Sequence, residues 1–274
     1  MLRFGTSGIP LSSPRQATDA GIRRARELGL DCLEMAWGNG VRMGEAMAER
    51  IRTAARENDV ELTAHAPYYV NLCGARDVRA RSLKRLIDTG RLARSCGARS
   101  FCFHAGFYQG RDPEVARAGV RTALTAVAAR LRAEGVTVDV RPELTGKPTQ
   151  LGSLEEIVDW SHQVPGIHPC VDFSHHVART QGSDNRYEGF ARILEAIAAR
   201  LGRRALRRLH VHVSGIEYGP RGERRHLPLR QSEFRYRELL RALKDQRVGG
   251  WVVCESPAME NDALVLERAY RRLR

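Results

Sequence analysis

The sequence predicts an α/β fold, a single (β/α)8 barrel that forms one domain over residues 1–274. Eight short apolar runs alternate with eight longer segments in which apolar residues recur every three or four positions, as in amphipathic helices. No low-complexity linker interrupts this alternation, and the length suits one barrel. A doubly wound sheet is the alternative, although it would not bring side chains from the third to the eighth strand to one site.

The expected elements follow one another in strict alternation. The strands are expected at residues 2–6, 32–35, 61–65, 100–104, 137–143, 168–172, 208–213 and 250–255. The helices are expected at residues 14–28, 44–58, 78–96, 113–134, 154–163, 188–201, 232–245 and 260–272. Gly29, Gly97 and Gly135 follow three of these helices, where glycine commonly ends a helix. A polar loop at 179–186 and an irregular segment at 214–232, rich in Gly, Pro and charge, are expected on the active face.

Six of the expected strands end in a side chain that can bind a metal. These residues are His65, His104, Glu143, Asp172, His212 and Glu255. The carboxyl ends of all strands in a parallel barrel open on one face, and that face carries the chemistry. The sequence therefore predicts a metal site at the C-terminal face of the strands, with more than one ion. Imidazole and carboxylate donors without thiolate favour Zn, Mn or Fe in an open catalytic site.

Three further residues beyond the strand ends extend this donor set. His175 lies three residues after Asp172, a spacing that allows both to face one cavity if the loop begins to coil. His226 lies in the irregular segment with Glu223 nearby, and the pair can complete a further metal site.

The other histidines are interpreted differently. His210 and His212 alternate along one strand, so both point the same way and His210 lies one layer deeper. We therefore favour His212 as a ligand and assign His210 to the core or to a supporting position. His176 is either a supporting or a surface residue, and His162 and His168 are assigned to structure or surface.

The composition is strongly basic. The formal charge is +13, from 45 basic and 32 acidic residues, and such an excess attracts polyanions. Nearly all the basic residues are arginines, many on expected helix surfaces, so genome composition or heat adaptation explains the charge equally well. Charge alone leaves nucleic-acid binding open.

Several features point away from membranes and secretion. No run of about 18 apolar residues is present, and the N-terminus lacks the apolar core and cleavage site of a signal peptide. The six cysteines form no Cys-x-x-Cys pair, and several lie in apolar strand runs where a buried thiol is the simplest interpretation. We expect a cytoplasmic protein without disulfides.

The motifs together resemble those of the endonuclease IV family (AP endonuclease family 2) within the xylose-isomerase-like TIM barrel superfamily. The segment from His65 to Leu72 resembles the His-x-x-Tyr-x-x-Asn-Leu motif of this family. The similarity continues, in the family's order, through Phe103–Gly106, Glu143–Gly146, Cys170–His175, the strand of His212, and Glu255–Pro257. It covers essentially the whole chain, and the motifs are specific as a set rather than singly.

The resemblance implies a TIM barrel with two or three Zn²⁺ ions per chain, Mn²⁺ being possible instead. It implies that His65, His104 and Glu143 hold one ion, that Glu143 bridges to a second held by Asp172, His212 and Glu255, and that His175 and His226 hold a third. The family has Asp two residues before the last of these histidines, where this chain has Arg224, with Glu223 one residue earlier. Either Glu223 replaces the Asp or the third site is weak or absent.

Two residues are expected to contact DNA. Tyr68 falls on the family's Tyr that enters the damaged duplex, and Arg42 lies in the loop where a DNA-probing Arg is expected. Enzymes that process damaged nucleotides flip them out of the stack, and a side-chain wedge can replace the lost stacking. Arg42 is equally well interpreted as a surface cation.

Three functions remain in competition at this point. The first is a metal-dependent endonuclease, acting as a monomer on double-stranded DNA, that cleaves 5′ to an abasic site with Glu143 positioning the nucleophile. The second is a single-metal sugar isomerase or epimerase, which needs only the donors of strands five to eight. The third is a nucleic-acid-binding barrel that has lost catalysis. His65, His104, His175 and His226 favour the first, because they are surplus to a one-metal sugar site.

Overall fold

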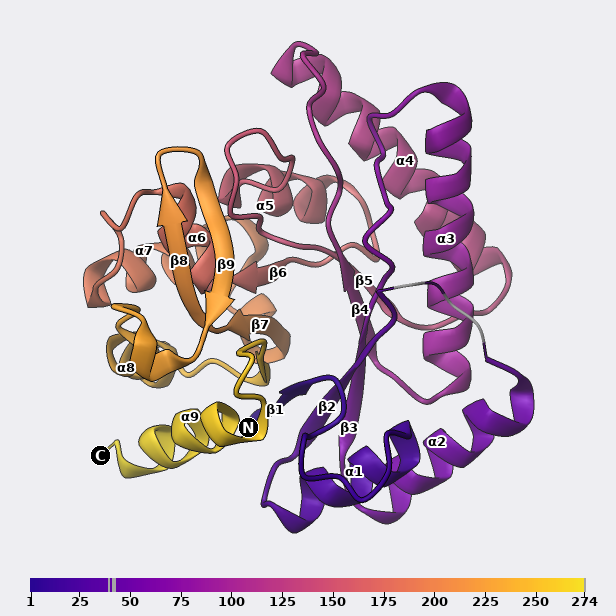
Figure 1. Ribbon diagram of the computed structural model, residues 1–274. Helices are drawn as coiled ribbons and strands as arrows, with labels where there is room; N and C mark the ends of the chain where they lie inside the picture. The colour runs from indigo at the N-terminus through magenta and orange to yellow at the C-terminus, as the bar shows by residue number, and fades with distance from the viewer. Residues whose placement is uncertain (39, 41–42, 274) are drawn as a thin grey trace.

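The computed structural model describes residues 1–38, 40 and 43–273, and its centre is a barrel of parallel strands (Figure 1). The barrel strands are β1 (Leu2–Ser7), β2 (Cys32–Ala36), β3 (Glu61–His65), β4 (Ser100–Phe103), β5 (Asp139–Pro142), β6 (Cys170–Asp172), β7 (Leu209–Val213) and β10 (Gly250–Cys254). They run in the order β5-β4-β3-β2-β1-β10-β7-β6. Two isolated bridges, Val140 with Ile167 and Glu143 with Cys170, join the two ends of this sheet. The predicted (β/α)8 barrel is confirmed.

Helices follow the strands and cover the outside of the barrel (Figure 1). They are α1 (Thr18–Glu27), α2 (Glu45–Glu57), α3 (Arg76–Ser95), α4 (Pro113–Ala133), α5 (Leu154–Gln163), α6 (Phe173–Arg179), α7 (Tyr187–Leu201), α8 (Tyr236–Asp245) and α9 (Glu260–Arg272), with 3₁₀ turns at Ala205–Arg208 and Leu229–Gln231. The short α6 was not expected. It starts where the chain leaves β6, and Asp172 caps its first turn.

Local signals in the sequence explain several helix starts. Ser153 and Glu156 form a capping box at the start of α5, each side chain bonding the other's backbone N–H. Asp112 caps α4, and Pro113 follows at the first helical position, where its missing N–H costs nothing. These caps set the ends of helices that pack their apolar faces on the barrel.

The floor of the barrel is closed by a buried arginine on β5. The Arg141 guanidinium is 2 % exposed and donates to the carbonyls of Pro169 and Arg208 and to the Asp139 carboxylate. A buried cation is stable only when its donors are paired, as they are here for two of its three nitrogens. This end of the barrel is therefore sealed, and the opposite end carries the site.

The segment after β7 forms an antiparallel hairpin rather than the irregular loop that the sequence suggested. The hairpin consists of β8 (Gly215–Gly219) and β9 (Gly222–Leu227) and lies beside α6 (orange in Figure 1). The expectation failed because β9 reads Gly-Glu-Arg-Arg-His-Leu, with charges where a buried strand has apolar residues. An exposed hairpin needs no such apolar run.

Candidate metal centre

The barrel brings all six strand-end donors to one mouth. His65 ends β3, Asp172 ends β6 and His212 lies on β7, while His104, Glu143 and Glu255 directly follow β4, β5 and β10. Most of these side chains are buried, and Glu143, Asp172 and His212 are fully so. The sequence therefore placed these residues correctly at the C-terminal face of the barrel.

Glu143 lies at the centre, and its two carboxylate oxygens face different partners. Oε2 is 3.1 Å from His65 Nε2 and 3.3 Å from His104 Nε2. Oε1 is 3.1 Å from His212 Nδ1 and 3.5 Å from His175 Nδ1. This one carboxylate therefore connects two groups of donors, which is the arrangement of a bridging ligand.

The second group consists of Glu143, Asp172, His212 and Glu255. Their donor atoms lie within 4.8 Å of one another. Asp172 Oδ1 accepts a hydrogen bond from the His175 backbone N–H at 2.7 Å, whereas Oδ2 has no hydrogen-bond partner within the described ranges. It faces His175 Nδ1 at 3.4 Å but accepts no hydrogen bond, so this fully buried oxygen carries a desolvation cost that a bound cation would remove. Because Asp172 Oδ2 lacks a hydrogen bond, this donor group fits a bound metal.

The third group joins α6 to the hairpin. His175 Nε2 is 3.1 Å from His226 Nε2 and 3.5 Å from Glu223 Oε2. Glu223 therefore lies next to both histidines, with Oε1 3.9 Å from His226 Nε2. Arg224 instead contacts Glu217 on the neighbouring strand.

A β-bulge explains how Glu223 and His226 reach the same face of β9. Residues three apart in a regular strand point to opposite faces. In this hairpin, Glu217 pairs with Arg225 and Tyr218 with Glu223, so Arg224 is an extra residue. The bulge shifts the alternation by one position and turns both side chains toward the mouth. The sequence suggested that Glu223 is nearby but not how it is presented.

The charged forms of the histidines and carboxylates at the mouth stabilise one another. Burial alone would lower the pKa of His65, but the hydrogen bond with Glu143 and the charges of Glu143, Glu34 and Glu255 together outweigh burial and raise the pKa to about 10. Burial also opposes the charged form of His175, yet the Asp172 and Glu223 carboxylates raise its pKa to about 9. Conversely, burial would raise the pKa of Glu143, and His104 and His212 hold it well below the ordinary range. In the metal-free protein, protons on the histidines balance the buried carboxylates.

Glu34 is a residue of the site that the sequence did not reveal. It lies on β2, is fully buried, and its Oε1 is 3.2 Å from His212 Nε2. It also accepts a hydrogen bond from the Thr63 hydroxyl at 3.0 Å. Burial would raise its pKa, but His212 and His210 lower it well below the ordinary value. A carboxylate inside the apolar run of a parallel strand was the available signal, because such strands are buried on both faces.

Of the two residues expected to contact DNA, the structure describes Tyr68 but not Arg42. Tyr68 is 64 % exposed at the rim, with its ring 5.6 Å from that of His65. It lines the mouth cavity and therefore stands where it can meet a ligand. Arg42 lies outside the residues that the structure describes.

The remaining histidines lie away from the mouth donors. His176 is buried and pairs with Asp184 at 2.9 Å, so it supports the segment after α6 rather than lying on the surface. His168 is 3.8 Å from Asp139 at the floor of the barrel, and His162 is exposed on α5, as expected for structural or surface residues.

The mouth opens into a cavity of about 340 Å³ lined by His65, Tyr68, His104, His175, Glu223, His226 and Glu255 among others. Beside it, a cavity of about 620 Å³ is lined by the hairpin turn and by Lys147, Arg221 and Arg224. Glu223 lines both, so the second cavity continues the first along a basic edge.

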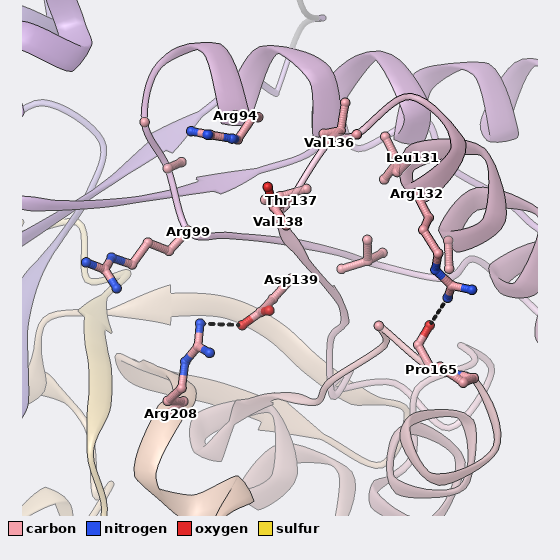
Figure 2. Close-up of a pocket in the computed structure, with 16 residues that line it drawn as sticks. Arg94, Arg99, Leu131, Arg132, Val136, Thr137, Val138, Asp139, Pro165 and Arg208 are labelled. Carbon is pink, nitrogen blue, oxygen red and sulfur yellow. Dashed lines mark hydrogen bonds and ion pairs between the residues drawn. The ribbon is translucent and has the colours of Figure 1, made fainter.

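A third cavity, of about 640 Å³, lies at the opposite end of the barrel (Figure 2). Arg94, Arg99, Arg132 and Arg208 line it, and Arg208 pairs with Asp139. None of the donor groups described above reaches it, so we place the chemistry at the smaller mouth cavity.

Comparison with known proteins identifies the family. Residues 22–274 match the family described as xylose isomerase-like TIM barrel. The chain belongs to this family. The recognition of this superfamily from sequence motifs is thereby confirmed.

The family contains a relative similar over its full length. An uncharacterized protein of Methanocaldococcus jannaschii is 39 % identical over 274 residues, which cover 100 % of this chain and 98 % of the relative. No activity comes from this comparison, because the relative is itself uncharacterized.

Solved structures of two functional kinds share the fold. Endonuclease IV from Thermus thermophilus superposes with a TM-score of 0.76 at 21 % identity, covering 97 % of both chains. A D-tagatose 3-epimerase-like protein gives 0.72 at 16 % identity, covering 98 % of this chain and 96 % of its own. D-psicose 3-epimerase from Clostridium cellulolyticum gives 0.66 at 16 % identity, covering 97 % and 96 %. At such identities the similarity shows the fold alone.

The helices in the described part of the chain differ from membrane spans. None of them combines the length and apolar character that crossing a membrane requires.

Proposed function

We propose that this protein is a metal-dependent phosphodiesterase that cleaves DNA on the 5′ side of abasic sites. The observation that carries the proposal is the number of donors around Glu143. A one-metal sugar site uses one group of donors. Here the Glu143 carboxylate faces two groups of donors, one with His65 and one with His212, and the group of His175 and His226 lies beside them. Such a surplus suits the charge that develops when a phosphodiester is cleaved.

The proposed ligands divide into three sets. His65, His104 and Glu143 would hold one ion, Glu143, Asp172, His212 and Glu255 a second, and His175, His226 and Glu223 a third. Zn²⁺ is the proposed metal because the donors are imidazoles and carboxylates, with Mn²⁺ as an alternative. When bound, such ions supply an activated water and stabilise negative charge on the phosphate.

The protein's own groups perform the remaining tasks. The Ala66 carbonyl lies 2.8 Å from His65 Nδ1 and Glu34 lies 3.2 Å from His212 Nε2, so each ring is held through one nitrogen and turns the other toward Glu143 and the mouth. Tyr68 stands exposed at the rim, where its ring can stack on a base or sugar displaced from the duplex. The basic edge formed by Lys147 and Arg221 can neutralise phosphates of the flanking DNA.

The direct test is incision of a labelled duplex with one abasic site by zinc-loaded protein. The expected product carries a 3′-hydroxyl that a polymerase can extend. Glu143→Gln should lower incision by more than about 100-fold, since even supporting residues of metal sites cost that much. His162→Gln, exposed on α5, serves as the matched control and should incise normally. Normal incision by Glu143→Gln would refute the assignment.

A sugar epimerase is the second candidate, and a specific observation favours it. Glu143, Asp172, His212 and Glu255 form a self-sufficient group at one side of the mouth, and two of the structural neighbours are named as epimerases or epimerase-like. Metal content separates the two functions. Two or three ions per chain support the endonuclease, whereas one ion with ketose epimerisation and no incision supports the epimerase. Salt-sensitive DNA binding with neither activity would indicate a barrel that has lost catalysis.

A further inference from the structure

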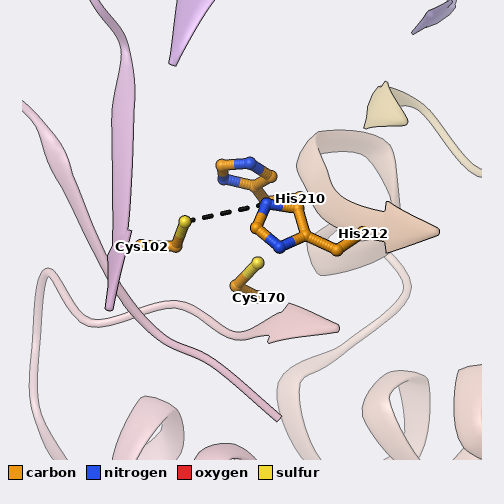
Figure 3. Close-up of side chains that lie close together, drawn as sticks. All are labelled: Cys102, Cys170, His210 and His212. Carbon is orange, nitrogen blue, oxygen red and sulfur yellow. Dashed lines mark hydrogen bonds between the residues drawn. The ribbon is translucent and has the colours of Figure 1, made fainter. Parts of the chain in front are cut away.

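A second cluster of donors lies deeper in the barrel, beneath the mouth. It consists of Cys102 on β4, Cys170 on β6, and His210 and His212 on β7 (Figure 3). All four side chains are fully buried, and each offers one donor atom within 4.8 Å of the other three. No sequence motif indicated this cluster, because each cysteine alone reads as a buried apolar residue.

The two ring nitrogens of His212 face different environments. Nδ1 points to the mouth, 3.1 Å from Glu143 Oε1, whereas Nε2 points inward, 3.7 Å from Cys102 Sγ. Zinc bound tetrahedrally by sulfur at about 2.3 Å and by nitrogen at about 2.0–2.1 Å would separate two such donors by about 3.6 Å. The observed distance of 3.7 Å between His212 Nε2 and Cys102 Sγ is close to this value.

His210 supplies a second observation that points to a ligand. Its Nδ1 is 3.1 Å from the Ser100 hydroxyl, which fixes the orientation of the ring. Its Nε2 is fully buried and has no hydrogen-bond partner in the described part of the chain. Glu34 Oε2 is 2.9 Å away, close enough for an ion pair but not in hydrogen-bonding geometry. With Nδ1 held by Ser100, Nε2 is the nitrogen left to bind a metal, which would take the place of its contact with Glu34.

We propose that Cys102, Cys170, His210 and His212 form an inner, four-coordinate metal site of the Cys2His2 type. Zn²⁺ is the natural occupant, because closed sites of thiolate and imidazole are structural zinc sites. Binding would release the two thiol protons, so that two thiolates balance the charge of the ion, and a His212 ring that also held a mouth ion through Nδ1 would lose its remaining N–H proton and act as an imidazolate. This site goes beyond the proposed endonuclease function, which uses no thiolate.

The competing explanation is a metal-free network. Glu34 contacts both His210 and His212, and its carboxylate could balance their charges without any ion. That network accounts for the histidines and for Cys102, whose thiol donates to Glu34 Oε2 at 3.5 Å and to the Ala64 carbonyl at 3.6 Å, but it does not include Cys170. Cobalt substitution separates the explanations, because Co²⁺ bound by thiolate absorbs strongly in the near ultraviolet and Co²⁺ bound only by imidazole and carboxylate does not.

The experiment is titration of metal-free protein with Co²⁺, followed by absorption spectroscopy. We expect a thiolate charge-transfer band that falls by about half or more in Cys170→Ala, since one of two thiolates is removed. Cys170 decides the question because Cys102 also lies near His65 and Glu143 of the mouth. Cys254→Ala, a buried thiol on β10 outside the cluster, is the matched control and should keep the full band.

Two results would overturn the inner site. One is a cobalt-saturated wild-type protein without the thiolate band, which requires no variant to fold. The other is an unchanged band in Cys170→Ala or Cys170→Ser, each checked for folding by circular dichroism. The outcome is independent of the endonuclease proposal, because His226→Ala should abolish incision and leave the band intact.

Discussion

At the scale of single residues, the two carboxylate oxygens of Glu143 organise the site, because each faces different histidines. Glu143 presents one oxygen to His65 and His104 and the other to His212 and His175. The sequence identified Glu143 as a ligand, because a carboxylate follows an apolar run at a strand end. Glu34 was missed although a carboxylate in an apolar strand run is a signal, because the partners of that residue depend on closure of the barrel.

The unpartnered oxygen of Asp172 leads to a prediction about metal affinity. Asp172→Asn keeps an oxygen to accept from the His175 N–H but removes the negative charge, so we expect metal affinity to fall by about 10–100-fold or more. Competition with a chelating dye measures the change. Asp184→Asn, which alters a carboxylate paired with His176 and Arg192, should leave metal affinity unchanged. An Asp172→Asn protein with wild-type affinity would contradict the assigned role.

The raised pKa values of His65 and His175 predict how metal binding depends on pH. Both imidazoles hold protons in the metal-free fold up to about pH 10 and 9, and a metal must displace them. Binding at pH 7 should therefore release protons, and apparent affinity should rise as the pH rises toward 9–10. Calorimetry in buffers of different ionisation enthalpy measures the protons released. Affinity independent of pH over this range would show that the histidines are neutral.

The same shifts predict the stability of the metal-free protein. A pKa that folding raises stabilises the fold fully below the unfolded value, about 6.5 for histidine, and the gain is lost as the pH rises through the folded value. The contribution of His65 and His175 should thus be complete near pH 6 and disappear between about pH 9 and 10. Urea unfolding of metal-free wild type and His65→Gln should differ at pH 6 and converge at pH 10. A constant difference would contradict this linkage.

At the scale of elements, the hairpin of β8 and β9 decides whether the third donor group is complete. Its bulge at Arg224 converts a three-residue spacing into one face of a strand. Helix and strand positions elsewhere followed from apolar periodicity, but this hairpin has none, so its sequence predicted a loop. The short α6 was equally hidden, although the interpretation that Asp172 and His175 face one cavity depended on the chain coiling there.

The bulge can be tested by removing it. Deleting one arginine of the Arg224–Arg225 pair leaves Glu223 and His226 two residues apart, which places them on one face of a regular strand. We therefore expect the deletion to retain the metal content of wild type, as measured by elemental analysis. His226→Ala should lose the third ion in both backgrounds. Loss of that ion on deletion alone would show that the bulge does more than restore the alternation.

At the scale of the whole molecule, the barrel collects its donors from strands far apart in sequence, in a chain with a formal charge of +13. The fold and the position of the six strand-end side chains at one mouth were predictable because strand termini in a parallel barrel share one face. The inner cysteines were not, since nothing in the sequence gives the distance across the barrel between β4 and β6.

The basic edge beside the mouth predicts the salt dependence of DNA binding. Lys147 and Arg221 line the adjoining cavity, so each should contribute about one phosphate contact. Lys147→Ala and Arg221→Ala should each reduce the slope of log K against log salt by about one. Arg268→Ala, on α9 away from the mouth, is the matched control. Equal slopes for all three variants would place the DNA elsewhere.

The junction between β5 and β6 has a consequence for how the barrel opens. These strands meet only through the bridges at Val140 and Glu143 in the described chain, whereas the other neighbours pair over three residues or more. Glu143 and Asp172 stand on opposite sides of this seam, each at the end of its strand. An ion held by both carboxylates would link β5 to β6, the neighbouring strands that pair least in the described barrel. Loss of the ion would then weaken the contact between β5 and β6 and open the barrel at the same time. The metal of the active face would therefore also stabilise the closed barrel.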